Sequence, residues 1–343
     1  MAVERTIVLT KTPLKEAFAL DGIFQLLPFK SERAPEIPSY ARVYPCFLEY
    51  LMEDDESLEM DIKREREIVD ALTAISQYRF YLEDIHRDEW CVPYPMFILD
   101  FGKFADDSVR TDDVKSTYGY PLFYYPEMNK DLICDSFSDL TNVPQMKCWM
   151  TFGYGGSTDL TRPDVKQQSK ICFAPTIKDS LAAYFSTTGK IRKRLASIFH
   201  LVASGLSMGD FQDSVAFLAY VSAIEGMVKL DSIVNPKQIS TEKCPECQRP
   251  FSSLGKDFRN FLNTYAAENE FEKEVIEKIY GQRCKIAHSG DIFQRDIPLL
   301  SESSEKEFEQ NSLQYHTIAL TRKSIANWLT RNKDKLTGGN DEF

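Results

Sequence analysis

The hydrophobic pattern changes near residue 176, and this change constrains the fold more than any other feature of the chain. Downstream of it, apolar residues recur at intervals of three and four, with few glycines or prolines between them. This spacing places the apolar side chains on one face of a helix. The two clearest stripes are Leu195, Phe199, Val202 and Leu206, and Phe217, Val221, Ile224 and Val228. We predict helices over 177–208, 211–230, 254–267, 270–288 and 304–332, packed as a compact bundle.

Upstream of residue 176 the apolar stretches are short, and segments rich in proline, glycine and aspartate separate them. Such stretches are typical of strands in a mostly antiparallel sheet. We predict strands at 6–10, 42–51, 96–101, 120–125, 148–154 and 171–173. One helix is predicted from Lys63 to about Asp84, because four apolar residues keep helical spacing: Ile68, Leu72, Ile75 and Leu82. The predicted fold class is α+β, with a mixed, sheet-containing domain over 1–175 and an all-α bundle over 176–343.

The two predicted domains differ in charge. The whole chain of 343 residues has a formal net charge of −11, which by itself argues against a broad basic surface for nucleic acid. However, residues 1–175 contain 19 lysines and arginines against 30 acidic residues, whereas residues 176–343 contain 22 of each. The acidic surplus thus lies in the first domain, and nucleic acid is not excluded as a ligand of the second. We expect the acidic domain to be a sensor or regulator that receives a protein or small-ligand trigger.

Apolar runs and cysteines bear on the cellular location. No apolar run approaches the roughly 18 to 20 residues that span a bilayer, and charges interrupt the N-terminal segment where a signal peptide is apolar. The eight cysteines are scattered, and only one pair is closely spaced. This is the pattern of reduced thiols rather than of a disulfide framework. We therefore expect a cytoplasmic protein with no membrane partner.

Cys244 and Cys247 form the one closely spaced pair, a C-x₂-C string in a polar insert. Two thiolates at this spacing are typical zinc ligands, but a closed site needs four ligands, and the chain has no second C-x₂-C and no H-x₃₋₅-H string. A structural zinc completed by distant cysteines or by a second copy of the chain stays open, as does a pair of unligated thiols. Metal analysis of the purified chain separates the two, because a structural site holds zinc in a fixed ratio to protein.

Residues 205–209 match the G-x-S-x-G string of serine hydrolases. In those enzymes the serine lies on a sharp turn from a strand into a helix, which exposes its hydroxyl. Here the string follows a helical stripe, so we predict the end of a helix and no hydrolase.

The strongest candidate for chemistry is the string YGQRCKIAHSG, from Tyr280 to Gly290, at the end of a predicted helix. Arg283 and His288 are separated by four residues, which on an ideal α-helix puts them about 140° apart in projection and about 7.5 Å apart along the axis. A long arginine side chain at that offset reaches toward an imidazole at the fraying helix end. Arginine keeps its charge and histidine titrates near neutrality, so the pair suits phosphodiester chemistry. The alternative is a capping histidine beside a surface arginine.

Three further segments accompany this string: FLAYVSAIEGMVKL at 217–230, the insert with the paired cysteines, and a short helix after it. Together they resemble the HEPN family, in its Apea-like branch, over roughly residues 180–332. The resemblance implies a metal-independent endoribonuclease that needs no cofactor and forms a homodimer, in which two R-x₄-H helices meet. It implies that His288 activates the ribose 2′-OH or protonates the leaving 5′-oxygen, while Arg283 binds the scissile phosphate. The implied products carry a 2′,3′-cyclic phosphate and a 5′-OH.

Three residues are supporting candidates. Glu225 lies one position off an apolar stripe, so we expect it to be partly buried, and a buried carboxylate needs a cationic partner. Arg283 is the partner that we expect, the alternative being a boundary glutamate that reaches water. Tyr280 would stack on a base or simply pack. Ser289 would donate to the phosphate or simply end the helix.

RNA would be attracted by the densest basic cluster of the chain, in the first helix of the bundle. Four cations in five positions cannot all face one side of a helix, so part of the cluster is expected to be an ordinary solvated face. The candidates for RNA binding are Lys190, Arg192, Lys193 and Arg194, together with Lys285 between the two catalytic candidates.

The resemblance also suggests a role for the whole chain. In bacteria, a ribonuclease joined to a regulatory domain would fit a toxin or an anti-phage abortive-infection effector. The alternative is a non-catalytic HEPN module that binds RNA or a nucleotide, or that serves dimerisation.

Overall fold

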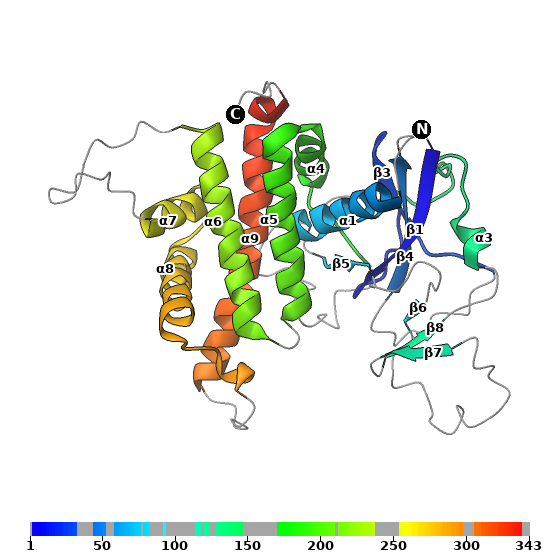
Figure 1. Cartoon of the computed structure of the whole chain (residues 1–343). Helices are drawn as coiled ribbons and strands as arrows, with labels where there is room; N and C mark the ends of the chain where they lie inside the picture. Colours follow the sequence, from blue (N-terminus) through cyan, green and yellow to red (C-terminus); the bar gives the residue numbers. More distant parts are fainter. Residues whose placement is uncertain are drawn as a thin grey trace. The chain divides into compact units, whose positions relative to one another are not determined.

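The computed structural model of the chain describes residues 2–32, 44–52, 58–76, 78–82, 92–93, 114–117, 120–123, 128–146, 170–209, 212–236, 254–297 and 305–337. The chain divides into two compact units. Unit 1 comprises Met1–Val69, Tyr78–Trp149 and Ser157–Phe173, and unit 2 comprises Asp70–Gln77, Met150–Gly156 and Ala174–Phe343. The first unit contains an antiparallel sheet and the second is mostly helical, so the α+β class is confirmed (Figure 1).

The main sheet of unit 1 is antiparallel, with the strand order β2-β3-β4-β1-β5. Its strands are β1 (Ala2–Thr10), β2 (Phe18–Leu20), β3 (Phe24–Pro28), β4 (Tyr44–Met52) and β5 (Phe80–Tyr81). A second sheet of order β6-β8-β7 contains β6 (Val92–Pro93), β7 (Val114–Thr117) and β8 (Tyr120–Phe123). The short helix α3 (Met128–Leu132) follows.

Three of the predicted strands coincide with β1, β4 and β8, whereas β2 and β3 were not predicted. The predicted strand at 171–173 is wrong, because these residues pair with no strand. They are apolar because they are buried: the Phe173 ring lies 4.8 Å from that of Phe18, edge to face. The strands predicted at 96–101 and 148–154 lie outside the described residues.

The predicted helix at 63–84 forms as α1 (Leu58–Ile75), so its predicted end is wrong. The chain leaves the helix after Ile75, and Phe80 and Tyr81 pair with β1 as strand β5. Tyr78 and Phe80 are buried and face the Phe173 ring. Burial of these aromatic rings and the strand pairing therefore outweigh the helical spacing that Leu82 seemed to continue.

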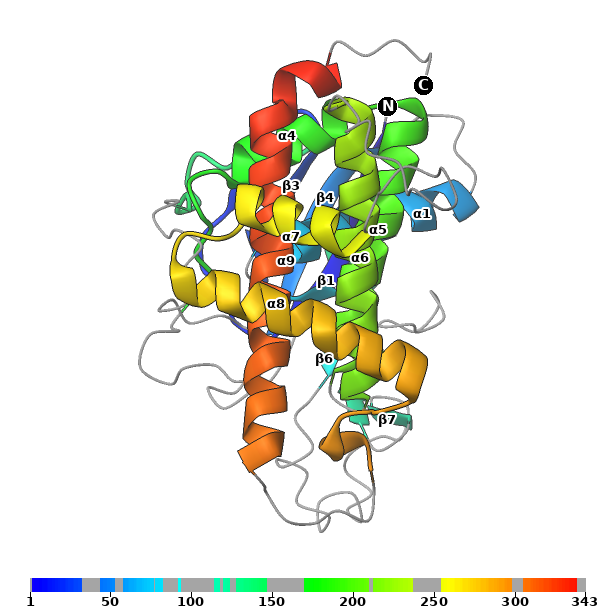
Figure 2. The ribbon, with the colours of Figure 1, turned by 90° about the vertical axis from the view of Figure 1, so that its left-hand side faces the viewer.

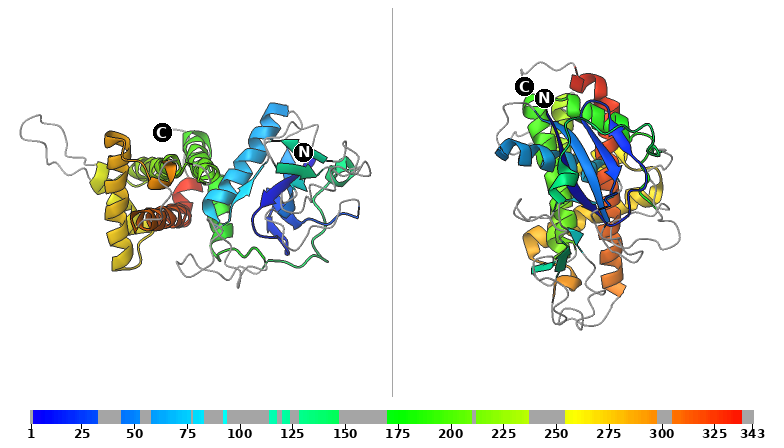
Figure 3. Two further views of the ribbon diagram at one scale, coloured as in Figure 1. Left: turned by 90° about the horizontal axis from the view of Figure 1, so that it is seen from below. Right: turned by 90° about the vertical axis from the view of Figure 1, so that its right-hand side faces the viewer.

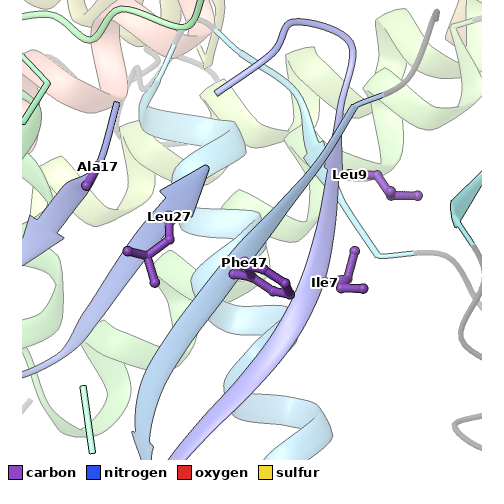
Figure 4. Close-up of a cluster of buried hydrophobic side chains, with 5 residues drawn as sticks. All are labelled: Ile7, Leu9, Ala17, Leu27 and Phe47. Carbon is purple, nitrogen blue, oxygen red and sulfur yellow. The ribbon is translucent and has the colours of Figure 1, made fainter. Parts of the chain in front are cut away.

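One face of the main sheet carries a small apolar core (Figure 4). Leu27, Phe47 and Ile7 lie side by side on three neighbouring strands, since Phe47 is in register with both of the others. Leu9 and Ala17 complete the cluster. The end of α3 and the segment after it pack against the cluster through three partly buried residues: Leu132, Leu140 and Val143. Apolar contact thus joins this segment to the sheet.

Glu49 of β4 forms the polar counterpart of this contact. Its side chain is 0% exposed, and its two oxygens accept hydrogen bonds from Arg5, Gln25 and Ser138, including 2.8 Å from Arg5 Nε and 2.8 Å from the Ser138 backbone N–H. Arg5 also donates to the Asp131 carbonyl. Burial alone would raise the pKa of Glu49, but these hydrogen bonds outweigh it and lower the pKa.

Unit 2 consists of α4 (Ile177–Ser186), α5 (Gly189–Met208), α6 (Asp213–Val234), α7 (Leu254–Tyr265), α8 (Glu270–Cys284) and α9 (Glu305–Thr337). A π-helical turn, Lys285–Ser289, continues α8, and a 3₁₀ turn lies at Gln294–Asp296. α7 and α8 lie across α6 and α9 (Figure 2). The left-hand view of Figure 3 shows the helices of this unit from below. Among the described residues, none of the helices has the length and apolarity needed to cross a membrane.

The predicted helices at 211–230, 254–267 and 304–332 are confirmed as α6, α7 and α9. The single helix predicted over 177–208 is wrong, because it is broken between α4 and α5. Thr187 has extended backbone, and its hydroxyl and its N–H both donate to the Tyr184 carbonyl, which ends α4. Gly189 then starts α5 with a positive φ of 60°.

The G-x-S-x-G string lies at the end of α5 and does not follow a strand, in agreement with its interpretation as a helix end. Gly205 is needed for packing, since a Cβ there would lie 2.5 Å from the Tyr220 ring. The glycine thus permits close contact between α5 and α6, and the string has no nucleophile geometry.

We predict that Glu49→Gln destabilises unit 1 by about 2 kcal/mol, because the change removes a buried charge from a network that retains the Arg5 cation. Since the folded-state pKa of Glu49 is depressed, its contribution is present above about pH 4.5 and is lost as the pH falls through the folded value. Urea unfolding of wild type and variant at several pH values measures both effects. Glu4→Gln, the same change at an exposed position on β1, is the control. Equal stabilities of the two variants would contradict the prediction.

Candidate functional site

Arg283 and His288 meet at the end of α8. Arg283 Nη1 lies 3.1 Å from His288 Nε2, and the imidazole is exposed. A guanidinium has only donors, so Nε2 must accept, and the proton of a neutral imidazole is then on Nδ1. The structure thus brings together the two residues that the sequence singled out.

The backbone that joins them differs from the predicted one. Residues 285–289 form a π-helical turn rather than the last turn of an α-helix, and the backbone N–H groups of Gly290 and Asp291 both donate to the Lys285 carbonyl. In a π turn the backbone hydrogen bonds join residues that are five apart in sequence. Two such residues therefore lie more nearly on the same face of the helix than they do in an α turn. The offset of about 140° applies to an ideal α-helix, whereas part of this segment is a π turn. The wider turn lets the short imidazole meet the guanidinium.

The carboxylate of Glu225, on α6, lies on the other side of the Arg283 guanidinium. Glu225 Oε1 is 3.2 Å from Arg283 Nε, with the two side chains 17% and 22% exposed. Oε1 makes no hydrogen bond of acceptable geometry, so the contact is an ion pair. This is the pairing expected from the sequence. Half-buried charges attract more strongly than exposed ones, and the ion pair holds the arginine head against α6.

Tyr280 packs within the unit. Its ring lies 5.3 Å from that of Phe258 and covers Gly255, where a Cβ would lie 2.8 Å from the ring. The guanidinium of Arg259 stands 5.8 Å from the ring centroid. These contacts support the packing interpretation of Tyr280 over base stacking.

Lys285 and Ser289 are both exposed on the π turn beside His288. Their positions allow contact with a ligand at the imidazole. Cys284, which follows Arg283, is a free, half-buried thiol.

The basic cluster on α5 divides into two parts. Lys190, Lys193 and Arg194 are exposed. Arg192 instead donates to the carbonyls of Phe185 and Thr187 at the end of α4, at 2.9 and 3.3 Å. Its guanidinium also lies over the ring of Tyr184. The three exposed cations are thus free of the α4–α5 junction, whereas Arg192 is engaged there. RNA binding by this cluster stays a prediction.

The predicted zinc ligands cannot be located in the described part of the structure. Cys244 and Cys247 lie outside the described residues. Within the described part of the chain, no group of three or more histidine, cysteine, aspartate or glutamate residues has a geometry that would hold a metal ion.

Sequence reasoning missed the segment that follows His288. Asp296 accepts hydrogen bonds from the backbone N–H groups of Asp213 and Ser214 at the start of α6, each 2.7 Å long. The Ser214 hydroxyl accepts from the Phe293 N–H at 2.7 Å. These contacts join positions about 80 residues apart, and a sequence gives no local signal for them.

No family model matches the chain, and searches of curated proteins and of solved structures found no significant match.

We predict opposite effects of alanine at two exposed glycines of this region. Gly290 ends the π turn with a φ of 66°, so Gly290→Ala strains the backbone and destabilises unit 2 by about 1 kcal/mol. Gly281 lies within α8 with open space around it, so Gly281→Ala stabilises the helix by about 0.5–1 kcal/mol. Urea unfolding followed by far-UV circular dichroism measures both. A stabilising Gly290→Ala would show that the turn is not held in this conformation.

Proposed function

We propose that the chain is a metal-independent endoribonuclease of the HEPN type, with Arg283 and His288 as its catalytic residues. The observation that supports this most is the contact between the Arg283 guanidinium, which keeps its charge, and a ring nitrogen of His288 at an exposed helix end. Glu225 supports it further, because it orients the guanidinium from the buried side. No metal or cofactor enters the proposed reaction.

The chemistry follows from the two side chains. When a phosphate replaces His288 as the partner of Arg283, the Nε2 lone pair becomes free to accept a proton. The ribose 2′-OH gives up its proton as its oxygen attacks phosphorus. The bond from phosphorus to the 5′-oxygen breaks, and that oxygen receives a proton from a protonated imidazole. Arg283 stabilises the extra negative charge on the phosphate in the transition state. The products carry a 2′,3′-cyclic phosphate and a 5′-OH.

A base and an acid are both needed, so we propose a homodimer in which two copies of His288 share one RNA. Apolar exposure supports a partner at this end of the bundle. Ile292 directly precedes Phe293, which binds α6, and Phe308 lies two residues before Gln310, which accepts from the Gln294 N–H. Ile292 and Phe308 are exposed apolar side chains on these two segments. A contiguous apolar patch often marks a protein interface, so these two side chains are candidates for the dimer contact.

For the whole chain we propose a cytoplasmic toxin or anti-phage effector whose first domain controls the nuclease. The acidic surplus of residues 1–175 supports this, because an acidic domain competes with RNA for basic residues or receives a basic trigger.

A non-catalytic module that binds RNA or nucleotide phosphate is the second candidate. The contact between Arg283 Nη1 and His288 Nε2 favours this candidate as well, because the arginine then occupies the Nε2 lone pair that a general base would need. In this case the imidazole serves only to orient the arginine.

We predict that the purified chain cleaves RNA in the presence of EDTA and leaves 2′,3′-cyclic phosphate ends. His288→Ala and Arg283→Ala each lower the rate by about 100-fold or more, since each removes a general acid–base or a charge-stabilising group. Cleavage of labelled RNA, with end-group analysis, measures this. The control is His200→Ala, at an exposed histidine on α5.

The two candidate functions give different results in this assay. Cleavage that is unchanged in both variants would contradict the nuclease assignment. Binding of RNA without any cleavage by wild type, lost in Arg283→Ala, would establish the non-catalytic module instead.

We predict that RNA affinity depends on salt through the exposed cations of α5. Lys193→Ala and Arg194→Ala each weaken binding and reduce the slope of log K against log salt by about 1, because each removes one phosphate contact. Arg192→Ala leaves the slope unchanged and lowers the melting temperature, since Arg192 binds the end of α4. Fluorescence anisotropy with a labelled RNA at several salt concentrations measures the slopes. Equal slopes in all variants would place the RNA elsewhere.

A further inference from the structure

We propose that Asp296 is a positioning residue for His288, acting by fastening the segment after the π turn to the start of α6. The consequence for catalysis rests on the proposed nuclease function. The fastening itself rests on contacts in unit 2 alone.

The Asp296 carboxylate caps helix α6 from a distant part of the chain. Its Oδ1 and Oδ2 accept from the N–H groups of Asp213 and Ser214, both at 2.7 Å. The first N–H groups of a helix have no partner within the helix, and the helix dipole favours a negative charge there. No side chain at the N-cap position, Gln212, supplies this acceptor. Asp296 therefore satisfies a need of α6 that its own sequence leaves open.

Further contacts make this attachment two-sided. The Asp213 carboxylate, 4% exposed, lies 3.1 Å from Arg295 Nη1. Each of the two segments in contact therefore supplies one acidic group. The Ser214 hydroxyl accepts from the Phe293 N–H, and the buried Phe293 ring meets that of Phe217 at 5.3 Å. On the other side, the Gln294 N–H donates to Gln310 of α9 at 2.9 Å.

Helix α6 thereby becomes the common support of the two catalytic candidates. Arg283 is tied to it through Glu225, and His288 through the segment that ends at Asp296. Glu225 and Asp213 are twelve positions apart on one helix, which is about 18 Å along its axis. A rigid rod of that length holds the guanidinium and the imidazole in a fixed relation.

The connection between His288 and the capped segment is short. Gly290, with its left-handed φ, turns the chain out of the π turn, and Phe293 is already bound to α6. Only four residues separate His288 from Phe293. A loss of the cap is therefore transmitted to the imidazole, whose productive placement tolerates little error.

The test compares Asp296→Asn with Asp291→Asn, the same change at an exposed position of the same segment. The asparagine retains one acceptor oxygen and loses the charge. For Asp296→Asn we expect kcat for RNA cleavage to fall about tenfold or more, with KM within about twofold. Asp296→Glu, which keeps the carboxylate, restores part of kcat. Asp291→Asn resembles wild type.

The imidazole signal of His288 in a ¹H–¹³C spectrum gives a readout that is independent of activity. The chain has four histidines, so His288→Gln identifies the signal. We expect it to shift or broaden in Asp296→Asn, while the His200 signal stays in place. A variant that is only less stable, with normal kcat below its melting temperature and an unchanged His288 signal, would overturn the proposal.

Failure of the proposed function is recognised separately. If wild type cleaves no RNA, the nuclease assignment is wrong. The His288 signal in the spectrum then tests by itself whether Asp296 positions the imidazole. An unchanged His288 signal would then overturn the role of Asp296, and a changed one would support it.

Discussion

The ion pair between Glu225 and Arg283 is the interaction on which the candidate site depends. An arginine in the last turn of a helix would otherwise sample many rotamers, at an entropic cost for every ligand that it binds. The half-buried carboxylate of α6 limits this freedom by pairing with Nε, and it leaves Nη1 in contact with His288. The π turn then brings the imidazole within reach of the same guanidinium. Fixed donors of this kind stabilise developing charge without reorganisation.

Unit 1 shows the same physical solution in a structural role. Glu49 is fully buried in the sheet, and Arg5 together with neutral donors compensates its charge. Its partners come from β1, β3 and the segment after α3, so one carboxylate joins three parts of the unit. Burial of a charge is costly unless it is paired and hydrogen-bonded, so both units place a carboxylate opposite an arginine that is distant in sequence.

Elements that depend on long local patterns were predictable. The stripe of α6 runs over three turns, and Glu225 beside it required a cation, which led to Arg283. Features set by distant contacts were not. Residues 171–173 have strand composition because they are buried by aromatic rings. The break at Thr187 depends on the hydrogen bond from its hydroxyl to the Tyr184 carbonyl. The π turn differs from an α turn by a single step in hydrogen bonding, and the cap by Asp296 joins segments about 80 residues apart. None of these leaves a periodic signal.

The most direct measurement is an experimental structure of the chain with an RNA that carries a 2′-O-methyl group at the scissile position, which blocks attack by the 2′-oxygen. The expected result is a phosphate within hydrogen-bond distance, about 3 Å, of the Arg283 guanidinium. His288 Nε2 is then released from Arg283 and faces the 2′- or 5′-oxygen. RNA bound elsewhere, with the contact between Arg283 and His288 intact, would contradict the assignment of these two residues as a phosphodiester site.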